Sequence, residues 1–466
     1  MVQRLPLFAC RRRCDKTARG LTPSYTGTVQ FFVHNFGCRA SQADGAAIEA
    51  GLAGEGLASA SSYATADWVV LNTCTVTSNA DDDLRQAVRR VQRENPAARI
   101  LVTGCYAQRA PQEIAALSGV SMVVGNSHKT RIPELIRPRL VQLGPVESYH
   151  GEIHVGDIFA HQEFLAASVE DAAGDRARPN LKIQDGCGNR CSFCIIPSVR
   201  GGSRSMALAD VLRQVRALSA GYAEVVLSGI NLGRWGRELG FESGRGPMRL
   251  AGLVRFLLDE TPVARLRLSS VEPMDFSTEL LELMASSDRI ARHVHAPLQS
   301  GSDTVLRRMH RKYRPRHYED RLRLAHSLMP DAAFGADVMA GFPGETDGEF
   351  DESYRFIESL PFTYLHVFTY SERPGTPAAS HANPVPMPVR KDRNRQLREL
   401  AAAKNLAFRQ SMIGRRLSAV TLESGTRALS GNYLQIELPE SRPARQMLEA
   451  EIRGVSASGL IADLIS

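Results

Sequence analysis

The sequence lacks any run of eighteen or more consecutive apolar residues, the length that a membrane-spanning helix needs. Its N-terminus also lacks the apolar core of a secretory signal. We therefore expect no membrane partner and a cytoplasmic location. With 466 residues, of which 43% are hydrophobic and 23% charged, the chain has the composition of a globular protein, with room for about three domains.

The eight cysteines lack the spacing of a disulfide framework in a small secreted domain. They form one compact group, one dispersed group and a pair in an Arg-rich arm: Cys187, Cys191 and Cys194; Cys38, Cys74 and Cys105; Cys10 and Cys14. In a cytosolic protein such grouping indicates bound metal.

The N-terminal part alternates short apolar runs with helical patterns, which predicts a parallel sheet of βα units. Strands are expected at 28–34, 67–72, 99–103 and 122–125, with helices from about 41, from about 78 and at 111–117. Cys38, Cys74 and Cys105 each follow one of these strands. Because the carboxyl ends of parallel strands meet at one edge, the three thiols could converge into one site.

Two interpretations of these three cysteines remain open at this point. Free cysteine often packs as a small buried hydrophobe, so each thiol taken alone could be inert. Taken together they favour a ligand role, because all three have small or polar neighbours at loop positions, where function concentrates.

A second series of βα units begins after a weakly patterned segment, 141–178, which we interpret as a linker. Its strands are expected at 181–185, 224–228, 265–269, 293–298, 334–339 and 364–369, and six such strands predict an open, partial βα barrel. The compact cysteine group follows the first of them, at the edge where βα barrels build active sites.

The spacing C-x3-C-x2-C of Cys187, Cys191 and Cys194 places three thiolates in one tight loop. A four-iron cluster held by three thiolates keeps one iron free to bind another molecule. Zinc is the main alternative, but a closed structural zinc site normally needs four ligands, and neither a fourth Cys nor a His lies near this loop.

This loop resembles the motif of the radical S-adenosylmethionine superfamily, and the chain resembles a methylthiotransferase from Thr28 almost to its end. The three N-terminal cysteines, the central motif, Pro-Leu-Gln-Ser-Gly-Ser at 297–302 and Gly-Phe-Pro-Gly-Glu-Thr at 341–346 occur in the order found in that family. Segments 72–77, 104–108 and 373–377 are similar to the branch that modifies threonylcarbamoyladenosine beside the tRNA anticodon.

The resemblance implies an α/β fold in three domains after an extension, 1–27, that we expect to be disordered. These are an N-terminal methylthiotransferase domain (28–140), a radical S-adenosylmethionine domain with a partial (βα)6 barrel (179–410) and a small antiparallel barrel of the TRAM type (411–466). Short β-like runs at 418–422, 433–438 and 448–455 agree with the last of these.

The resemblance also implies the chemistry, two 4Fe-4S clusters and S-adenosylmethionine. Cys187, Cys191 and Cys194 would bind the cluster that cleaves S-adenosylmethionine to a radical, and the second cluster, on Cys38, Cys74 and Cys105, would carry the sulfur. The product would bear a methylthio group on carbon 2 of N6-threonylcarbamoyladenosine at position 37. The implied partners are the tRNA anticodon loop, a low-potential electron donor and a sulfur donor.

Three other functions stay open: methylthiolation of isopentenyladenosine, methylthiolation of a ribosomal-protein aspartate, and a non-catalytic iron-sulfur protein that binds RNA. The tail and the motifs disfavour the protein substrate. Six cysteines so placed, together with a complete barrel edge, exceed what a non-catalytic protein needs.

Seven polar or small residues at the ends of the predicted barrel strands are candidates to bind S-adenosylmethionine: Ser228, Gly229, Asn231, Ser270, Glu272, Gln299 and Ser300. The alternative is structural, with Gly229 serving a turn and Glu272 merely solvated. Thr346, with Glu349 three residues on, predicts a capping box at a helix start.

A formal net charge of +7 agrees with an anionic partner, although proteins that never bind nucleic acid can carry it too. Two clusters have few acids beside them in sequence: Arg307, Arg308, Arg311, Lys312, Arg314 and Arg316; Arg390, Lys391, Arg393, Arg395 and Arg398. We expect both to contact RNA phosphates. In the tail, by contrast, acids match the basic residues.

Overall fold

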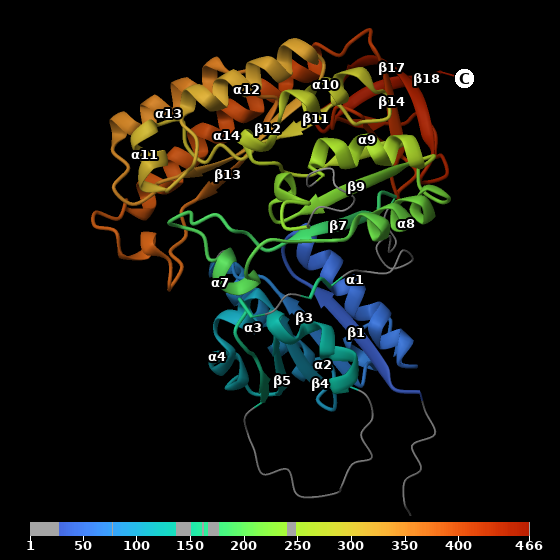
Figure 1. Cartoon of the computed structure of the whole chain (residues 1–466), viewed down its shortest axis with the longest axis vertical. Helices are drawn as coiled ribbons and strands as arrows, with labels where there is room; N and C mark the ends of the chain where they lie inside the picture. Colours follow the sequence, from blue (N-terminus) through green and yellow to red (C-terminus); the bar gives the residue numbers. More distant parts are fainter. Residues whose placement is uncertain are drawn as a thin grey trace, which may run out of the picture.

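The computed structural model describes residues 28–76, 78–136, 151–160, 163–165, 177–239 and 248–465. The predicted extension 1–27, with Cys10 and Cys14, and most of the predicted linker lie outside the described residues. In Figure 1 the N-terminal sheet lies below, the central βα part above it, and the C-terminal barrel, in red, beside the central part.

The N-terminal part is a parallel sheet in the order β2-β1-β3-β4-β5-β6. Its elements are β1 (Gln30–Asn35), α1 (Arg39–Gly54), β2 (Ala58–Ser59), β3 (Trp68–Thr73), α2 (Ser78–Glu94), β4 (Arg99–Gly104), α3 (Cys105–Arg109), α4 (Pro111–Ala115), β5 (Val120–Gly125), α5 (Ile132–Ile136) and β6 (Glu152–His154). All six residues of β3 are buried, as an apolar run covered by helices on both faces requires. The predicted sheet of βα units is confirmed.

Three short elements escape the sequence patterns. The two-residue strand β2 and the one-turn helix α3 are too short to show a period. The third, β6, lies inside the segment predicted as a linker, and it pairs with β5 at the edge of the sheet. Part of that segment therefore belongs to the N-terminal sheet.

The central part contains the six predicted parallel strands, β7, β9, β10, β11, β12 and β13. Its elements are β7 (Asn180–Asp185), α7 (Ile196–Arg200), β8 (Arg204–Ser205), α8 (Leu208–Ser219), β9 (Glu224–Gly229), α9 (Leu250–Glu260), β10 (Arg265–Leu268), α10 (Thr278–Ser286), β11 (His293–His295), α11 (Asp303–Arg308), α12 (Pro315–Leu328), β12 (Ala333–Ala340), α13 (Asp347–Ser359), β13 (Tyr364–Thr369) and α14 (Met387–Gln410). The strands form the series β8-β7-β9-β10 and β11-β12-β13, which one bridge between Leu266 and Ile290 connects. The result is an open, partial barrel with its apolar core between strands and helices.

The predicted capping box is present at the start of α13. The Thr346 side chain accepts a hydrogen bond from the Glu349 main-chain N–H, and the Glu349 carboxylate accepts one from the Thr346 N–H. Each bond satisfies a donor that the helix start would otherwise leave without a partner.

The C-terminal part is a closed barrel in the order β14-β15-β16-β18-β17. Its strands are β14 (Arg416–Thr421), β15 (Arg427–Ser430), β16 (Gln435–Glu437), β17 (Met447–Val455) and β18 (Leu460–Ile465). Four of the pairings are antiparallel, but β16 and β18 pair in parallel. The predicted barrel is confirmed with that one departure from antiparallel order. In the described parts of the chain, no helix is long and apolar enough to cross a membrane.

A buried group of charges joins the N-terminal sheet to the partial barrel. Asp44 on α1 accepts hydrogen bonds from Lys129, from Lys182 on β7 and from Arg200 on α7. Asp185, at the end of β7, also binds Lys182 and Arg200. Figure 1 shows α1 lying directly under β7, where these contacts form. The position of the two parts is therefore fixed by paired charges out of contact with water.

A second buried charge group holds the C-terminal barrel against the central strands. Glu224 on β9 binds Arg265 and Arg267 of β10 at 2.6 and 2.7 Å. The two guanidinium groups also donate to the main-chain oxygens of Ser418, Leu429, Ser430 and Gly431. Burial alone would raise the pKa of Glu224, but Arg267 and Arg265 together lower it, so the carboxylate stays charged.

Candidate active site

The structure brings the three N-terminal cysteines to one edge of the parallel sheet. Cys38 precedes α1, Cys74 directly follows β3, and Cys105 begins α3 directly after β4. Burial raises the pKa of the Cys74 thiol to about 12, and the nearby Cys105 and Cys38 raise it as well. Neutral thiols in that setting become thiolates only when a cation compensates the charge, and an iron cluster would do so.

Two glycines with positive φ allow the cysteines to approach one another. Gly37 has φ +89°, and a Cβ built on it would lie 2.5 Å from the Cys74 Cβ. Gly104 has φ +100°, and a Cβ there would lie 2.3 Å from the main-chain oxygen of Thr73. Only glycine can place the chain this close in this conformation.

Replacing Gly104 with Ala is expected to displace Cys105 and lower the iron bound by the N-terminal site. The conformation alone costs about 1–3 kcal/mol, and the contact with Thr73 adds to that cost. Iron and sulfide content measured after anaerobic reconstitution tests this prediction. Gly56→Ala is the matched control, because Gly56 has φ +84° but no atom within 4 Å of the added Cβ. Equal iron in the two variants would contradict the prediction.

The central cysteines lie in the loop between β7 and α7. Burial raises the pKa of Cys187, and it raises that of Cys194 to about 12. Cys187 accepts hydrogen bonds from the Asn189 main-chain N–H at 3.4 Å and from Asn231 Nδ2 at 3.5 Å. These contacts would fix the direction of one thiolate in a three-cysteine site.

Arg311 is the residue of this site that sequence reasoning assigned wrongly. It was placed in a cluster expected to contact RNA, but it is buried, and its Nη1 donates to Cys191 Sγ at 3.2 Å. Its Nη2 donates to the Glu272 carboxylate at 2.6 Å. His310, with φ +56°, turns the chain just before it. No spacing in the sequence signals that turn.

The two cysteine sites lie beside each other. Ile195, which follows Cys194 directly, packs with Val199 against Cys105. Asn126 contacts Cys105 and also Val199 on α7: its Nδ2 lies 3.6 Å from Cys105 Sγ and donates to the Val199 carbonyl at 2.7 Å. The helix that follows the central cysteines therefore forms one side of the N-terminal site.

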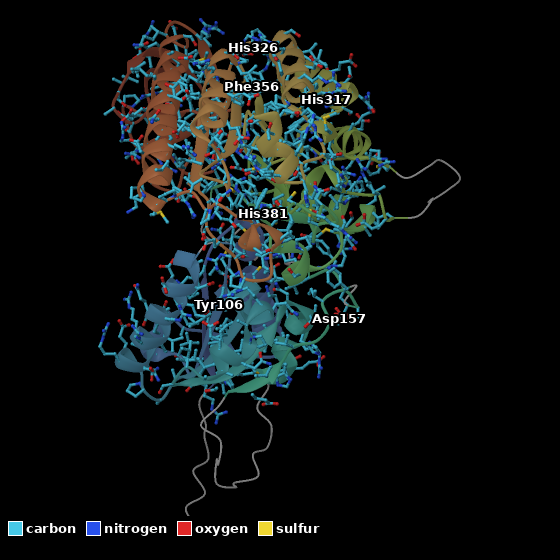
Figure 2. The ribbon with its side chains drawn as sticks, turned by 90° about the vertical axis from the view of Figure 1, so that its left-hand side faces the viewer. Tyr106, Asp157, His317, His326, Phe356 and His381 are labelled. Carbon is cyan, nitrogen blue, oxygen red and sulfur yellow. The ribbon has the colours of Figure 1, made fainter. Side chains whose placement is uncertain are left out.

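The segment that begins at Arg373 contacts both the N-terminal part and the loop of the central cysteines. Arg373 donates to the Asp81 carboxylate at 2.7 Å, and the Ala378 main-chain N–H donates to the Ser192 carbonyl at 2.8 Å. Figure 2 shows His381 at the level where the two parts meet, with Tyr106 below it in the N-terminal part.

Three of the seven candidates for binding S-adenosylmethionine contact site residues. Asn231 reaches Cys187, and its buried Oδ1 has no hydrogen-bond partner among the described residues. The Ser270 hydroxyl lies 2.7 Å from His295 Nδ1. Glu272 binds Arg311 and is therefore not merely solvated.

The other four candidates have structural contacts. The Ser228 hydroxyl donates to the Leu181 carbonyl, and Gly229 packs so closely on Gln184 that a Cβ would lie 2.9 Å from it. Gln299 has φ +67° and bridges to Val338. The buried Ser300 hydroxyl accepts a hydrogen bond from the Ser302 N–H.

The view that few acids balance the two basic clusters is wrong. Acids reach most of the arginines, one from the same segment and the others from distant segments: Arg307 and Arg314 pair with Asp303, Arg308 with Glu349, Arg311 with Glu272, Arg390 with Glu372, and Arg393 with Glu345 and Asp347. Arg395 pairs with Asp392 and Glu399 on its own helix. Among the described residues, Lys312, Arg316, Lys391 and Arg398 are the members of these clusters without an acidic partner.

Two family models match the chain, and each of them covers one of the two cysteine sites. A model described as the uncharacterized protein family UPF0004 matches residues 30–125, which contain the N-terminal cysteines. The model of the radical SAM superfamily matches residues 181–357, which contain the central ones.

Curated relatives match most of the chain. It is 40% identical to the threonylcarbamoyladenosine tRNA methylthiotransferase MtaB of Bacillus subtilis, over 79% of each chain. It is 36% identical to the protein of the same name from Aquifex aeolicus, over 86% of this chain and 94% of that one. The tRNA-2-methylthio-N(6)-dimethylallyladenosine synthase of Novosphingobium aromaticivorans is 32% identical over 84% of this chain and 86% of its own.

Solved structures of the radical S-adenosylmethionine methyltransferase TsrM from Kitasatospora setae share the fold. The structure with tryptophan and aza-SAM bound has a TM-score of 0.53 at 16% identity, covering 76% of this chain and 75% of that one. The cobalamin-bound structure has a TM-score of 0.54 at 15% identity.

Proposed function

Because the chain belongs to the radical S-adenosylmethionine methylthiotransferases, we propose that it adds a methylthio group to carbon 2 of N6-threonylcarbamoyladenosine in transfer RNA. The observation that carries the proposal is the adjacency of two three-cysteine sites across one domain junction. Identity of 36–40% with relatives named for this substrate supports the choice of base.

Cys187, Cys191 and Cys194 would hold the 4Fe-4S cluster that the superfamily implies. When bound, this cluster and S-adenosylmethionine supply reductive cleavage and abstraction of a hydrogen atom. The cysteines fit, because three partly buried thiols and no fourth Cys or His in their loop leave one iron for the cofactor.

We assign a second 4Fe-4S cluster to Cys38, Cys74 and Cys105. Its support is the convergence of three thiols, together with Arg200. Burial opposes the charge of Arg200, but Asp185 above all, and also Cys105, Asp44 and Cys38, raise its pKa well above its ordinary value. That guanidinium would compensate the negative charge of a thiolate-bound cluster.

The chain's own residues would position the reactants and exclude water. Arg311 holds Glu272 and Cys191 in one arrangement, and Asn231 and Ser270 stand beside them at the strand ends. Ile195 and Val199 pack on Cys105 and so place apolar side chains beside the N-terminal site.

The reaction implies further partners. A reductive cleavage needs a low-potential electron donor, and a repeated transfer needs a sulfur donor. The anticodon loop of tRNA would contact Lys312, Arg316, Lys391 and Arg398, whose charges have no acidic partner among the described residues. We place the protein in the cytoplasm with its substrate. We assign 28–140 with β6, 179–410 and 411–466 to the three domains.

Mass spectrometry of nucleosides from tRNA tests the proposal. The tRNA is incubated anaerobically with reconstituted protein, S-adenosylmethionine, sulfide and reductant. We expect methylthio-threonylcarbamoyladenosine. A methylthio group on isopentenyladenosine would move the chain to the other branch, and no methylthio nucleoside despite two intact clusters would refute a tRNA substrate.

A further inference from the structure

Arg39 occupies a position between the N-terminal cysteine site and the interior of the partial barrel. It follows Cys38 directly and is the first residue of α1. Its main-chain oxygen accepts a hydrogen bond of 2.9 Å from Asn180 Nδ2, on the first barrel strand, β7. The backbone of Arg39 is thereby fixed to the barrel.

The guanidinium of Arg39 differs from those of the other enclosed arginines. Arg200, Arg267, Arg311 and Arg393 each bind a carboxylate. Within the described parts of the chain, the Arg39 side chain has neither a hydrogen bond nor an ion pair. Burial lowers the pKa of Arg39, and none of the other groups that affect it most, which are Tyr433, Arg178, Arg267 and Tyr364, is a carboxylate. Arg39 is therefore a cation that pairs with no carboxylate among the described residues.

The surface that Arg39 faces is aromatic and polar. His293 lies against both Tyr433 and Tyr364, with ring centroids 4.4 and 5.9 Å away, and its Nε2 lies 2.6 Å from the Tyr364 hydroxyl. His295 stacks on Tyr364 at 5.8 Å. Stacked rings of this kind suit a planar base.

Two buried polar atoms on this surface have no hydrogen-bond partner in the described structure. They are His293 Nδ1 and Asn180 Oδ1, in side chains that are only 5–6% exposed, whereas His295 Nε2 lies 3.5 Å from Asp337 Oδ1. Buried polar atoms normally have a partner, so two of them near the Arg39 guanidinium point to a polar ligand.

The unpaired positive charge on this surface comes from Arg39 and not from the histidines, and Asp337, beside His295 and His366, is the carboxylate on it. Burial lowers the pKa of His295 to about 4 and that of His293 well below its ordinary value, with Arg39 contributing to both. Both imidazoles are neutral at neutral pH. The surface is open at β13, where His366 and Phe368 are each 49% exposed.

We propose that Arg39 binds the carboxylate of the threonylcarbamoyl group and so selects a base with an anionic N6 substituent over one with an uncharged substituent. The inference rests on the proposed function and assigns its substrate specificity to one residue. A guanidinium can bind a carboxylate through two parallel hydrogen bonds, a geometry that an uncharged alkyl group cannot use. The position beside Cys38 would hold the substituent next to the second cysteine site.

The test uses two synthetic anticodon stem-loops that carry N6-threonylcarbamoyladenosine either as the free acid or as its methyl ester. Product formed from the acid by the wild-type protein first establishes the proposed function. We then expect kcat/KM to favour the acid over the ester by about ten- to a hundredfold, as for a hydrogen-bonded charge pair. Arg39→Gln should lower kcat/KM for the acid by that factor and leave kcat/KM for the ester as in the wild-type protein. Arg39→Lys should keep part of the preference for the acid.

Arg178→Gln is the matched control, because Arg178 is a neighbouring arginine whose charge is paired with Glu224. It should keep the full preference for the acid. Iron content and 5'-deoxyadenosine formation show whether each variant is loaded. If wild-type protein uses acid and ester equally, or if a loaded Arg39→Gln still prefers the acid, the proposal is wrong. If Arg39→Gln loses iron, two results still test the proposal: the acid-to-ester ratio of kcat/KM in the wild-type protein, and the same ratio in Arg39→Lys.

Discussion

Replacing Cys105 with Ala is expected to abolish methylthio transfer while S-adenosylmethionine is still cleaved. Cys105 belongs to the N-terminal site, whereas cleavage depends on Cys187, Cys191 and Cys194 in the other domain. The methylthio nucleoside should fall by a factor on the order of 10³ or more, as when a member of a catalytic group is removed. The 5'-deoxyadenosine formed in the same reaction should stay within a few-fold of wild type. Nucleoside mass spectrometry and chromatography of the same samples measure both products.

Two further variants complete the comparison. Cys191→Ala should lose both products, because it disables the central site. Val199→Ala removes packing against Cys105 but no thiol, and both products should persist. If Cys105→Ala retained methylthio transfer, the second cluster would not be on these cysteines. If it also lost 5'-deoxyadenosine while its central cluster was intact, the two sites would not have the separate roles assigned here.

Replacing Asp44 with Asn is expected to destabilise the fold by about 3–5 kcal/mol, because it leaves buried cations without their counter-ion. Lys129, Lys182 and Arg200 all bind this carboxylate, and Asp185 alone cannot compensate them. Calorimetric unfolding of the apoprotein should show a lower midpoint than wild type. Asp82→Asn is the control, since Asp82 is 64% exposed in its pair with Arg85 and should change stability by about 0.5 kcal/mol or less. Equal midpoints for the two variants would contradict the expectation.

The same carboxyl predicts a pH dependence. Burial by itself would raise the pKa of Asp44, but Lys129, Lys182 and Arg200 together lower it below its ordinary value. A depressed folded-state pKa contributes stability that is present above the unfolded value of about 3.9. That contribution is lost as the pH falls from this value through the folded pKa. Asp44→Asn should therefore flatten the acid side of the stability profile and lower its plateau at neutral pH.

The parts of the site that local pattern determines could be predicted from sequence. Cys38, Cys74 and Cys105 converge because each follows a strand of a parallel sheet, and strand ends share an edge. Thr346 and Glu349 form a cap because the motif acts within one turn. The six barrel strands could also be recognised, because each is marked by a local run of apolar residues.

Contacts between distant segments could not be predicted. Arg311 looks like one of several cations in its segment, and only the fold brings it to Cys191 and Glu272. Asp44 is a single acid on a helix whose partners come from three other elements. For the same reason the acids that pair with the basic clusters were missed. Charge density along a sequence does not show which charges are paired in space.

The short helix α7 has a consequence for how the protein matures. It begins two residues after Cys194, and its Val199 packs on Cys105, with Arg200 beside the N-terminal site at its last turn. The loop that receives iron at the central cysteines therefore continues into the wall of the other site. Iron bound at the central cysteines would therefore also order this wall of the N-terminal site. Assembly of the N-terminal cluster should depend on the central one, whereas the central cysteines should take up iron without it.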